Sequence, residues 1–296
     1  MTPLRVGYLG PAGTFSEEAF LGFLAQSPLA HGLSIPEDHR QTYPQLSALF
    51  INAQGCDVLI APLENSTEGP ITETIDYLIG HPEYVIIQDL LLPVRLAFMV
   101  TPDFDPSTQT LKSILSHRQP LSQAQAYIFN HYPDAELSVW DSTASAAAYV
   151  AQHPQQGFAA IGSQNLAALY GLKILETNIQ DQTTNSTRFV VLCTPENPHC
   201  AALLTQSRAN ATKISIVFTT PKDVPGSLVK ALDVFAKRQI NMCSVVSRPA
   251  KTGMGDYMFW VDINAPAPSD FEAALAELKA VTSAVKVVGC YGSLAL

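Results

Sequence analysis

Short apolar segments that end in small polar residues and lead directly into a helical pattern recur five times before residue 165. Each segment has three to five residues, a length that suits a buried strand better than a helix. Strands that alternate with helices build parallel α/β sheets. The sequence therefore predicts an α/β fold, with strands at 5–9, 58–61, 114–116, 137–140 and 158–161.

Several helix starts can also be recognised. Thr14 is followed three residues later by Glu17, the pattern of a capping box. Ser269 and Glu272 repeat this pattern near the C-terminus. The segment Asp141-Ser142-Thr143 is expected to cap an alanine-rich helix.

Polar side chains gather where the predicted strands end. In parallel sheets, ligands bind outside the carboxyl ends of the strands. Each of these residues alone could be an ordinary helix cap, but together they predict a polar, mostly uncharged cleft for a small oxygen-rich molecule. The candidate ligand residues are Thr14, Asn65, Ser66, Ser116, Gln119, Thr143 and Ser163.

Residues 183–189, Thr-Thr-Asn-Ser-Thr-Arg-Phe, run straight into the apolar Val190-Val191-Leu192. Hydroxyls, one amide and one cation therefore stand where a loop becomes a strand, and the sheet behind them can hold such donors rigidly. The alternative interpretation is a Ser/Thr-rich turn that feeds a buried strand, with Arg188 pointing to solvent.

The net charge of −9 argues against nucleic acid as a partner, because phosphates require a basic surface. The charge is also unevenly distributed. Residues 1–200 hold 7 Lys or Arg and 19 Asp or Glu, whereas residues 201–296 hold 10 and 7. Opposite balances indicate two domains with different tasks.

Cysteine and histidine patterns indicate neither a disulfide framework nor a metal site. The five cysteines are scattered, odd in number and free of any C-x-x-C, as expected for reduced thiols in the cytoplasm. The seven histidines show no ligand spacing. The apolar stretches are too short for a membrane span, and residues 1–5 lack the apolar core of a signal peptide. We therefore expect a cytoplasmic protein with no metal and no membrane partner.

Familiar catalytic motifs are missing before residue 200. There is no G-x-S-x-G turn, and His117 is the one histidine at a predicted strand end. Glu64 and Glu68 lie four residues apart, whereas a glycosidase pair normally comes from separate strand ends. Lys112 and Lys173 are the only lysines in this part of the sequence. A site here must work mainly by hydrogen bonding, which favours a substrate that is already reactive.

Five sequence blocks, which span nearly all of residues 5–192, carry a family resemblance. They are Tyr8-Leu9-Gly10-Pro11-Ala12-Gly13-Thr14-Phe15-Ser16-Glu17, Pro62-Leu63-Glu64-Asn65-Ser66-Thr67-Glu68-Gly69, Ser116-His117-Arg118-Gln119, Asp141-Ser142-Thr143-Ala144 and Asn185-Ser186-Thr187-Arg188-Phe189. In order and spacing they resemble the signatures of the prephenate dehydratase family.

The resemblance implies a catalytic domain over residues 1–195, built from two α/β lobes like a type 2 periplasmic binding protein. The first lobe would comprise about 4–93 and 179–195, and the second about 94–178. The active site would lie between the lobes. Because the chain crosses twice between them, the cleft could close on its substrate and exclude water.

The resemblance also implies a reaction, in which prephenate loses its ring carboxylate as CO2 and its hydroxyl as water to give phenylpyruvate. No cofactor is required. Thr187 would be the catalytic residue, stabilising the departing hydroxyl in a dry site. Arg188 would pair with a substrate carboxylate, and Phe189 would lie against the ring or in the core. Because residues 1–200 are strongly acidic, helix N-termini and amides would supply much of the attraction for this dianion.

The rest of the chain predicts a separate regulatory domain. Residues 196–211 contain prolines and small residues typical of a linker. Residues 212–296 follow a βαββαβ order, which is the ferredoxin-like α+β arrangement. The expected elements are strands at 213–219, 240–247, 256–264 and 284–291 and helices at 226–238 and 269–281.

Two blocks in this region, Val224-Pro225-Gly226-Ser227-Leu228-Val229 and Ser247-Arg248-Pro249, resemble those of an ACT domain that senses phenylalanine. The sequence departs from the family at Val246, where glutamate is usual, and at Ser227, where alanine is usual. The resemblance implies feedback by L-phenylalanine at a paired ACT interface, and therefore a homodimer or homotetramer. The implied effector residues are Gly226, Ser227, Leu228, Val229, Asn241, Ser247, Arg248 and Pro249.

Two other functions remain open at this stage. Arogenate dehydratase acts on the amino-acid counterpart of prephenate, and Glu64 or Glu68 could approach the ammonium group of that substrate. A non-catalytic amino-acid sensor would use the same two domains but would not need the hydroxyl and arginine cluster at 183–188. We expect a monofunctional enzyme, without a fused chorismate mutase.

Overall fold

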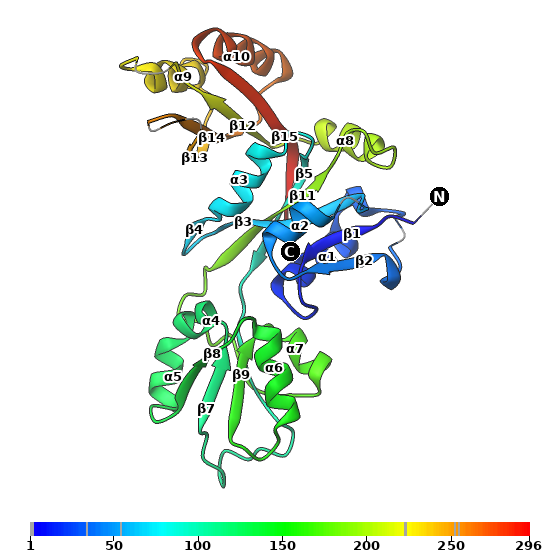
Figure 1. Ribbon diagram of the computed structural model, residues 1–296, viewed down its shortest axis with the longest axis vertical. Coiled ribbons are helices and arrows are strands. Elements are labelled where there is room, and N and C mark those ends of the chain that lie inside the picture. Colours follow the sequence, from blue (N-terminus) through cyan, green and yellow to red (C-terminus); the bar gives the residue numbers. More distant parts are fainter. Residues whose placement is uncertain (1–2, 34, 54, 222–223, 252, 254) are drawn as a thin grey trace.

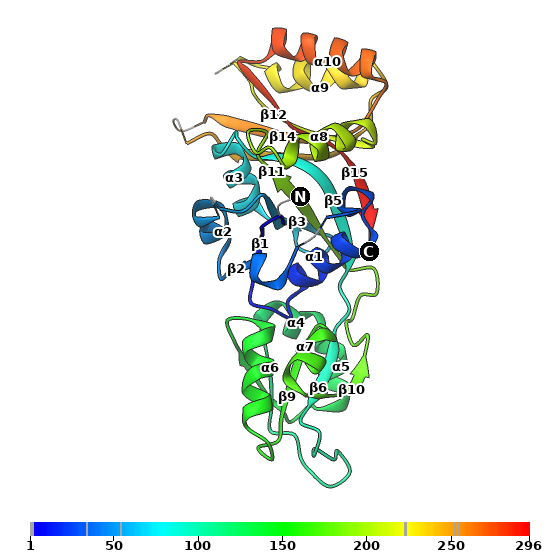
Figure 2. The ribbon, with the colours of Figure 1, turned by 90° about the vertical axis from the view of Figure 1, so that its right-hand side faces the viewer.

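The computed structural model describes residues 3–33, 35–53, 55–221, 224–251, 253 and 255–296, so the first two residues of the predicted catalytic domain lie outside it. The chain forms three units stacked along one long axis (Figures 1 and 2). The first lobe (residues 4–93 and 179–195) lies in the middle. The second lobe (94–178) and the C-terminal unit (212–296) lie at opposite ends of it.

The first lobe is built on the central strands of a large sheet. β1 pairs in parallel with β2 and β3, and β11 lies antiparallel between β3 and β5. The strands are β1 (Val6–Leu9), β2 (Arg40–Tyr43), β3 (Val58–Asn65), β4 (Gly69–Pro70), β5 (Val85–Pro93) and β11 (Ser186–Cys193), and the helices are α1 (Phe15–Gln26), α2 (Leu46–Asn52) and α3 (Thr72–Gly80), with 3-10 turns at Pro28–Ala30 and Glu37–His39. The predicted return of the chain to the first lobe as a strand at 186–192 is confirmed.

The second lobe has its own five-stranded sheet, in the order β10-β6-β9-β7-β8. Apolar clusters cover both faces of this sheet. The strands are β6 (Ala97–Val100), β7 (Ser113–Ser116), β8 (Glu136–Val139), β9 (Phe158–Gly162) and β10 (Lys173–Thr177), and the helices are α4 (Arg118–Gln123), α5 (Gln125–His131), α6 (Thr143–Gln152) and α7 (Asn165–Tyr170). The alternation of strands and helices that the sequence predicted is therefore confirmed in both lobes.

The C-terminal unit shows the predicted βαββαβ order. Its two helices lie on one face of its four strands, over a separate apolar cluster (Figure 2). The elements are β12 (Lys213–Thr219), α9 (Ser227–Ala236), β13 (Met242–Pro249), β14 (Tyr257–Asn264), α10 (Pro268–Val281) and β15 (Ala284–Ala295).

β15 joins the C-terminal unit to the first lobe. The sequence predicted that this strand would end at 291, but it continues to Ala295 and pairs in parallel with β5. All the strands of both units thus belong to one ten-stranded sheet, in the order β13-β14-β12-β15-β5-β11-β3-β1-β2 with β4 beside β3. Gly289 permits the approach, because a Cβ there would lie 2.4 Å from the carbonyl oxygen of Ile86.

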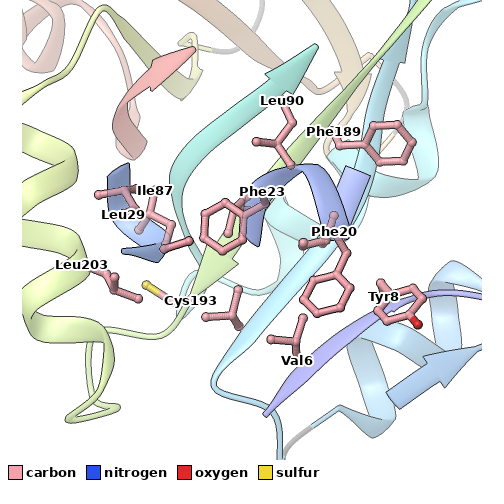
Figure 3. Close-up of a cluster of buried hydrophobic side chains, with 14 of the residues drawn as sticks. Val6, Tyr8, Phe20, Phe23, Leu29, Ile87, Leu90, Phe189, Cys193 and Leu203 are labelled. Atoms are coloured by element: carbon pink, nitrogen blue, oxygen red, sulfur yellow. The ribbon is translucent and has the colours of Figure 1, made fainter. Parts of the chain in front are cut away.

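The core of the first lobe lies on both faces of its strands. On one face, Phe20 and Phe23 of α1 pack against Val6, Leu90 and Phe189 (Figure 3). On the other face, residues of α2 and α3 share a cluster with Trp260 and Tyr291 of the C-terminal unit. Because this second cluster crosses from one unit to the other, the two units are held by common apolar burial as well as by β15.

The predicted linker is largely helical. Helix α8 (Cys200–Ala209) occupies most of 196–211, and Cys200, Leu203 and Leu204 are buried in the core of the first lobe. These residues, with the buried Ser207, follow the i, i+3, i+4, i+7 spacing of a helix that packs by one face. The prolines at 195 and 198 are typical of a linker, but they precede the helix and do not interrupt this spacing.

The predicted capping boxes at Thr14 and Ser269 are wrong. The Thr14 hydroxyl donates to the Pro11 carbonyl oxygen (2.9 Å) instead of accepting from α1, although Glu17 does accept from the Gly13 amide (2.6 Å). Helix α10 begins at Pro268, so Ser269 already lies inside its first turn. The third prediction is confirmed, since Ser142 caps α6 and its hydroxyl accepts from the amide of Ser145.

Within the part of the chain that the structure describes, no helix is both long and apolar enough to cross a membrane. The same residues contain no group of three or more His, Cys, Asp or Glu side chains that could hold a metal ion. The five cysteines are free thiols.

Candidate functional site

A cavity of about 450 Å³ lies between the two lobes, where the strand ends of both converge. Six predicted site residues line it. They come from the start of α1, the end of β3, the first turn of α4, the start of α6 and the beginning of β11. These residues are Thr14, Asn65, Gln119, Thr143, Thr187 and Phe189.

Thr187 is held in this cavity by Asn65 from the neighbouring strand. The Asn65 Nδ2 donates to Thr187 Oγ1 at 3.0 Å, and the two residues are directly paired across β3 and β11. The orientation of the Asn65 amide is fixed, because its Oδ1 accepts from the backbone amides of Thr67 (3.0 Å) and Glu68 (3.1 Å). Asn65 must therefore donate to Thr187, which leaves the hydroxyl proton of Thr187 free for a group in the cavity.

Asn185 holds the Asn65 side chain in place by hydrogen bonding, a role that the sequence did not reveal. Its Oδ1 accepts from Asn65 Nδ2 (3.0 Å) and from the Thr67 hydroxyl (2.9 Å), and the side chain is buried. The only sequence signal for Asn185 was its place at the start of the 185–189 block. The predicted ligand Ser66 has a similar supporting role, since its Oγ accepts from the Ser186 amide at 3.0 Å.

Ser116 and Ser163 lie behind the cavity and do not line it. Both are fully buried, and each hydroxyl is committed to a backbone carbonyl. Ser116 donates to Ile161 (2.6 Å) within the second lobe, whereas Ser163 donates to Gly13 (2.9 Å) of the first lobe. Their prediction as direct ligands is contradicted, because each hydroxyl already donates its proton to a backbone carbonyl. A serine at the end of a β-strand can make such a bond instead of binding a ligand.

Helix N-termini supply positive potential to the cavity. Thr14, Ile71 and Ser142 are the N-cap residues of α1, α3 and α6, and all three line it. Each helix start presents unpaired backbone N–H groups and about half a positive charge. No Lys or Arg occurs among the described lining residues, which instead include Glu68, His117 and Asp141. An anion in this cavity would therefore be bound largely by backbone amides and neutral donors.

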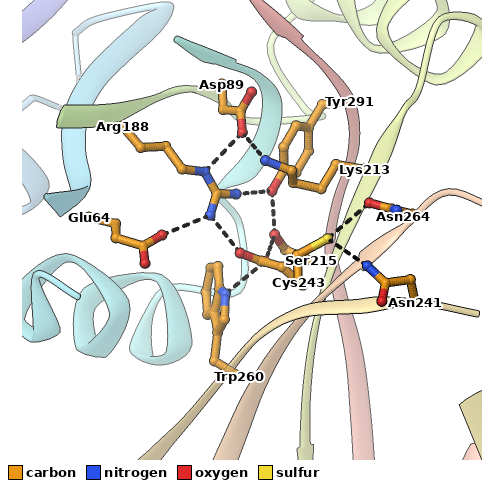
Figure 4. A network of polar contacts seen from close by, with 11 residues as sticks. Glu64, Asp89, Arg188, Lys213, Ser215, Asn241, Cys243, Trp260, Asn264 and Tyr291 are labelled. Atoms are coloured by element: carbon orange, nitrogen blue, oxygen red, sulfur yellow. Dashed lines mark hydrogen bonds and ion pairs between the residues drawn. The ribbon is translucent and has the colours of Figure 1, made fainter. Parts of the chain in front are cut away.

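Arg188 points away from the cavity, so its prediction as a substrate ligand is wrong. Its guanidinium donates from Nε to Asp89 (2.9 Å), from Nη1 to Asp262 (2.6 Å) and from Nη2 to the hydroxyl of Tyr291 (2.7 Å) (Figure 4). Glu64 lies 3.5 Å from Nη1. Neighbouring side chains on a strand face opposite sides, so Thr187 and Arg188 cannot both enter one cavity.

The electrostatic setting of Arg188 matches this geometry. Burial acts to lower the pKa of Arg188, but Tyr291, Asp262 and Asp89 outweigh it and hold the pKa above its ordinary value. Complete burial, reinforced by Asp262, raises the pKa of Tyr291. Arg188 is thus a permanent buried cation whose charge is balanced by protein groups, with none left for a ligand.

A second cavity, of about 740 Å³, lies in the C-terminal unit. Ser227 is the predicted effector residue that lines it, together with Val224, Pro225 and Tyr257. Gly226, which caps α9, has a φ of +77° that favours glycine. The other predicted effector residues, Leu228, Val229, Asn241, Ser247, Arg248 and Pro249, lie outside this lining.

Arg248, from the predicted effector block, contacts the first lobe. It forms a two-pronged ion pair with Asp76 of α3, at 2.7 and 2.9 Å. Hydrogen bonding to Arg248 holds the pKa of Asp76 below its ordinary value. Arg248 therefore connects the C-terminal unit with the helix whose N-cap, Ile71, lines the first cavity.

Comparison with known proteins agrees with this geometry. The family model for prephenate dehydratase matches residues 6–197. The chain belongs to the prephenate dehydratase family. It is 32% identical to the prephenate dehydratase of Bacillus subtilis strain 168 over 296 residues, which cover 99% of this chain and 100% of that protein.

Solved structures from the prephenate dehydratase family share the fold. Prephenate dehydratase from Arthrobacter aurescens in complex with L-Phe has a TM-score of 0.81 and 30% identity, over 98% of this chain and 90% of that one. The prephenate dehydratase of Staphylococcus aureus Mu50 has a TM-score of 0.77 and 25% identity, over 97% of this chain and 100% of that one. Since both matches cover the C-terminal unit as well as the lobes, the predicted architecture is confirmed as that of this family.

Proposed function

We propose that this chain is a prephenate dehydratase, which converts prephenate to phenylpyruvate, CO2 and water. Membership of the family and similarity over the full length of its relatives support this activity. The main observation behind the proposed activity is the Thr187 hydroxyl. It accepts a hydrogen bond from Asn65, so its own proton is free, and it lies in a cavity lined by helix N-termini.

The chemistry fits these groups. In prephenate, the bond to the ring carboxylate breaks, and its electron pair enters the ring as CO2 leaves. At the opposite ring carbon, the C–O bond breaks and its electron pair departs with the hydroxyl, which becomes water after taking a proton from solvent. Aromatisation drives both steps, so the protein needs to orient the ring and stabilise the negative charge on the departing oxygen. The Thr187 proton is available to hydrogen-bond that oxygen.

The substrate dianion would lie against the helix starts. We assign the helix starts at Thr14 of α1 and Thr143 of α6 to its carboxylates. At Thr14 the donors would be backbone amides, because the Thr14 hydroxyl already donates to the Pro11 carbonyl. Gln119 offers a neutral donor from the second lobe, and Phe189 a flat surface for the ring. This arrangement leaves the decarboxylating carboxylate without a strong ion pair, which would otherwise hold its electrons in place. No cofactor takes part in this scheme.

We assign the catalytic function to residues 1–195 and a regulatory ACT function to the C-terminal unit, with L-phenylalanine as the effector. The complex of the Arthrobacter relative with L-Phe supports this assignment. The effector site would include Ser227 and its neighbours at a contact between two C-terminal units. Strand β13 is suited to such a contact, because it lies at the edge of the sheet and exposes Val245. We therefore propose a homodimer or a homotetramer, located in the cytoplasm as the free cysteines suggest.

Formation of phenylpyruvate from prephenate by the purified full chain tests the proposed activity. We expect turnover without added metal or cofactor, and inhibition by L-phenylalanine. An enzyme that does not release phenylpyruvate under these conditions contradicts the proposal, and binding of L-phenylalanine without any turnover would point to an amino-acid sensor.

Arogenate is the second candidate substrate, and the acidic residues of the cavity favour it. Glu68 and Asp141 both line the cavity, and either carboxylate could receive an ammonium group. The values of kcat/KM for prephenate and arogenate, measured with one preparation, decide between the two. If kcat/KM is higher for arogenate than for prephenate, arogenate becomes the assigned substrate.

A further inference from the structure

The hydrogen bonds of the Arg188 guanidinium reach three strands from two units. Its neighbour on β5 is Asp89, whereas Asp262 comes from β14 and Tyr291 from β15 of the C-terminal unit. All three guanidinium nitrogens are engaged, so the side chain has one orientation. Since β14 and β15 supply two of the three hydrogen-bond partners, the position of the C-terminal unit determines where the Arg188 guanidinium can lie.

A second layer of contacts holds these partners in place (Figure 4). The Asp262 carboxylate also accepts from Trp260 Nε1 (2.9 Å) and from the hydroxyl of Ser215, which in turn contacts the Tyr291 hydroxyl. Lys213 donates to the same Asp89 oxygen as Arg188, at 2.8 Å. The network is almost dry, because Asp89, Asp262, Tyr291 and Ser215 are all at most 1% exposed. Electrostatic contacts in such a setting are strong and resist displacement.

The strand that carries Arg188 is irregular at this position. On β11, Thr187 pairs with Asn65 and Arg188 with Glu64, but Phe189 pairs with Pro62, so the register with β3 shifts directly after Arg188. Bulges of this kind bend a strand and change the direction of the side chains around them. The contacts of Arg188 therefore fix the backbone of β11 beside the bulge, where the direction of the Thr187 side chain is determined.

We propose that Arg188 is a positioning residue, through which the C-terminal unit controls the orientation of Thr187 in the cavity. Thr187 faces Asn65 and the cavity, while Arg188, one peptide away, faces the C-terminal unit. A shift of β14 and β15 relative to β5 must move the guanidinium, and with it the backbone that Thr187 shares. The regulatory part of this inference rests on the proposed function, because it takes L-phenylalanine as the ligand that shifts the C-terminal unit.

The test compares Tyr291→Phe with Glu277→Gln in the full chain. The first change removes one hydroxyl from Arg188 and leaves the aromatic ring in the core. The matched control breaks an ion pair of another arginine, Arg238, within the C-terminal unit (2.7 Å) and away from the network. For Tyr291→Phe we expect kcat to fall about tenfold with KM within about twofold, because the donor is misdirected while the cavity is intact. We also expect the half-inhibitory concentration of L-phenylalanine to change at least about fivefold.

A merely structural role for Arg188 predicts a different result. Tyr291→Phe would then lower the melting temperature but leave kcat and the response to L-phenylalanine like those of Glu277→Gln, and this outcome overturns the inference. The wild-type chain is assayed before any variant is compared. If it is inactive on prephenate, the proposed function is refuted. In that case hydrogen exchange of the backbone amides tests the inference. Exchange that is faster in Tyr291→Phe than in Glu277→Gln at residues 186–189, but not at the other strands of the first lobe, upholds it. Exchange that is equal in the two variants, or that is faster in all these strands alike, overturns it.

Discussion

The first lobe has two boundaries, and they are built differently. Towards the second lobe, the two sheets are separate and the chain crosses between them twice, with the Ser163 hydroxyl bound to Gly13 across the gap. Towards the C-terminal unit, the sheet is continuous through β15 and β5, the apolar core is shared, and the charged network of Arg188 is buried.

Because the two boundaries differ in construction, we expect a different kind of motion at each. Two chain crossings allow hinge motion, which would open and close the cavity around Thr187. A continuous sheet with a shared core allows only small displacements, because packed interiors transmit strain instead of absorbing it. The molecule therefore combines a boundary for substrate entry with one that can carry a signal.

The largest effect is expected at the cavity itself. Thr187→Val keeps the shape of the side chain but removes the hydroxyl, so the departing oxygen loses its donor. We expect kcat to fall at least about a hundredfold, the scale for loss of one such donor. Steady-state kinetics of phenylpyruvate formation measures this, and near-normal turnover would exclude the role assigned to Thr187.

A smaller but still large effect is expected from Asn65→Asp. The new carboxylate can still accept from the amides of Thr67 and Glu68, but it accepts from Thr187 instead of donating to it. The threonine proton is then no longer free for the substrate, and we expect kcat to fall about tenfold to a hundredfold. If the variant retains wild-type kcat at neutral pH, the direction of the hydrogen bond between these residues is not important for catalysis.

Gly289→Ala tests the rigid boundary. The added Cβ would meet the Ile86 carbonyl, which is backbone and cannot move aside cheaply. We expect a loss of about 1–3 kcal/mol in the free energy of unfolding, measured by urea denaturation. Gly80→Ala is the matched control, because no atom lies within 4 Å of its added Cβ and its φ is not positive. Equal stability of the two variants would show that β15 and β5 can separate at little cost.

Ser163→Ala tests the loose boundary. It removes the hydroxyl that joins the second lobe to Gly13, a hydrogen bond worth about 1 kcal/mol. Because this bond favours the approach of the lobes, we expect KM for prephenate to rise about fivefold with little change in melting temperature. A large loss of stability with unchanged KM would mean that Ser163 supports the fold and not the closure.

The smallest effect concerns pH and the contact between Arg248 and Asp76. The pKa of Asp76 is lowered in the folded protein, so the contact contributes stability above the ordinary aspartate pKa of about 3.9. That contribution is lost as the pH falls through the lower, folded-state pKa. We expect Arg248→Ala to be less stable than wild type at pH 6, and the difference to shrink below about pH 3. Urea midpoints at both pH values measure it, and a difference independent of pH would contradict the assignment.

Much of the fold could be predicted because it follows local rules. Strand ends that carry small polar residues identified the edge where Asn65 and Thr187 meet, and the alternation of strands and helices identified both lobes. Helix α8 was missed because two prolines mask the apolar spacing of Cys200, Leu203 and Leu204. β15 was cut short because Gly292 and Ser293 have little strand preference, and only a partner strand could show that they continue it.

The direction of Arg188 could not be predicted for a related reason. A run of polar residues does not reveal which face of the sheet each one occupies, and the register shift after Arg188 depends on β3, more than 120 residues earlier. Asn185 was overlooked because its partners Asn65 and Thr67 are equally remote. Long-range pairing, and not residue type, decided which polar groups reach the cavity.

The helix starts around the cavity have a consequence for how the site tolerates mutation. Side-chain cations can be lost by a single substitution, but backbone N–H groups survive every replacement except proline. A binding surface made of the first turns of α1, α3 and α6 can therefore keep its hold on a dianion while the residues around it vary. The Thr187 hydroxyl, which we propose as the catalytic donor, has no such protection. We therefore expect replacement of this one side chain to lower kcat while leaving the affinity for the substrate in place.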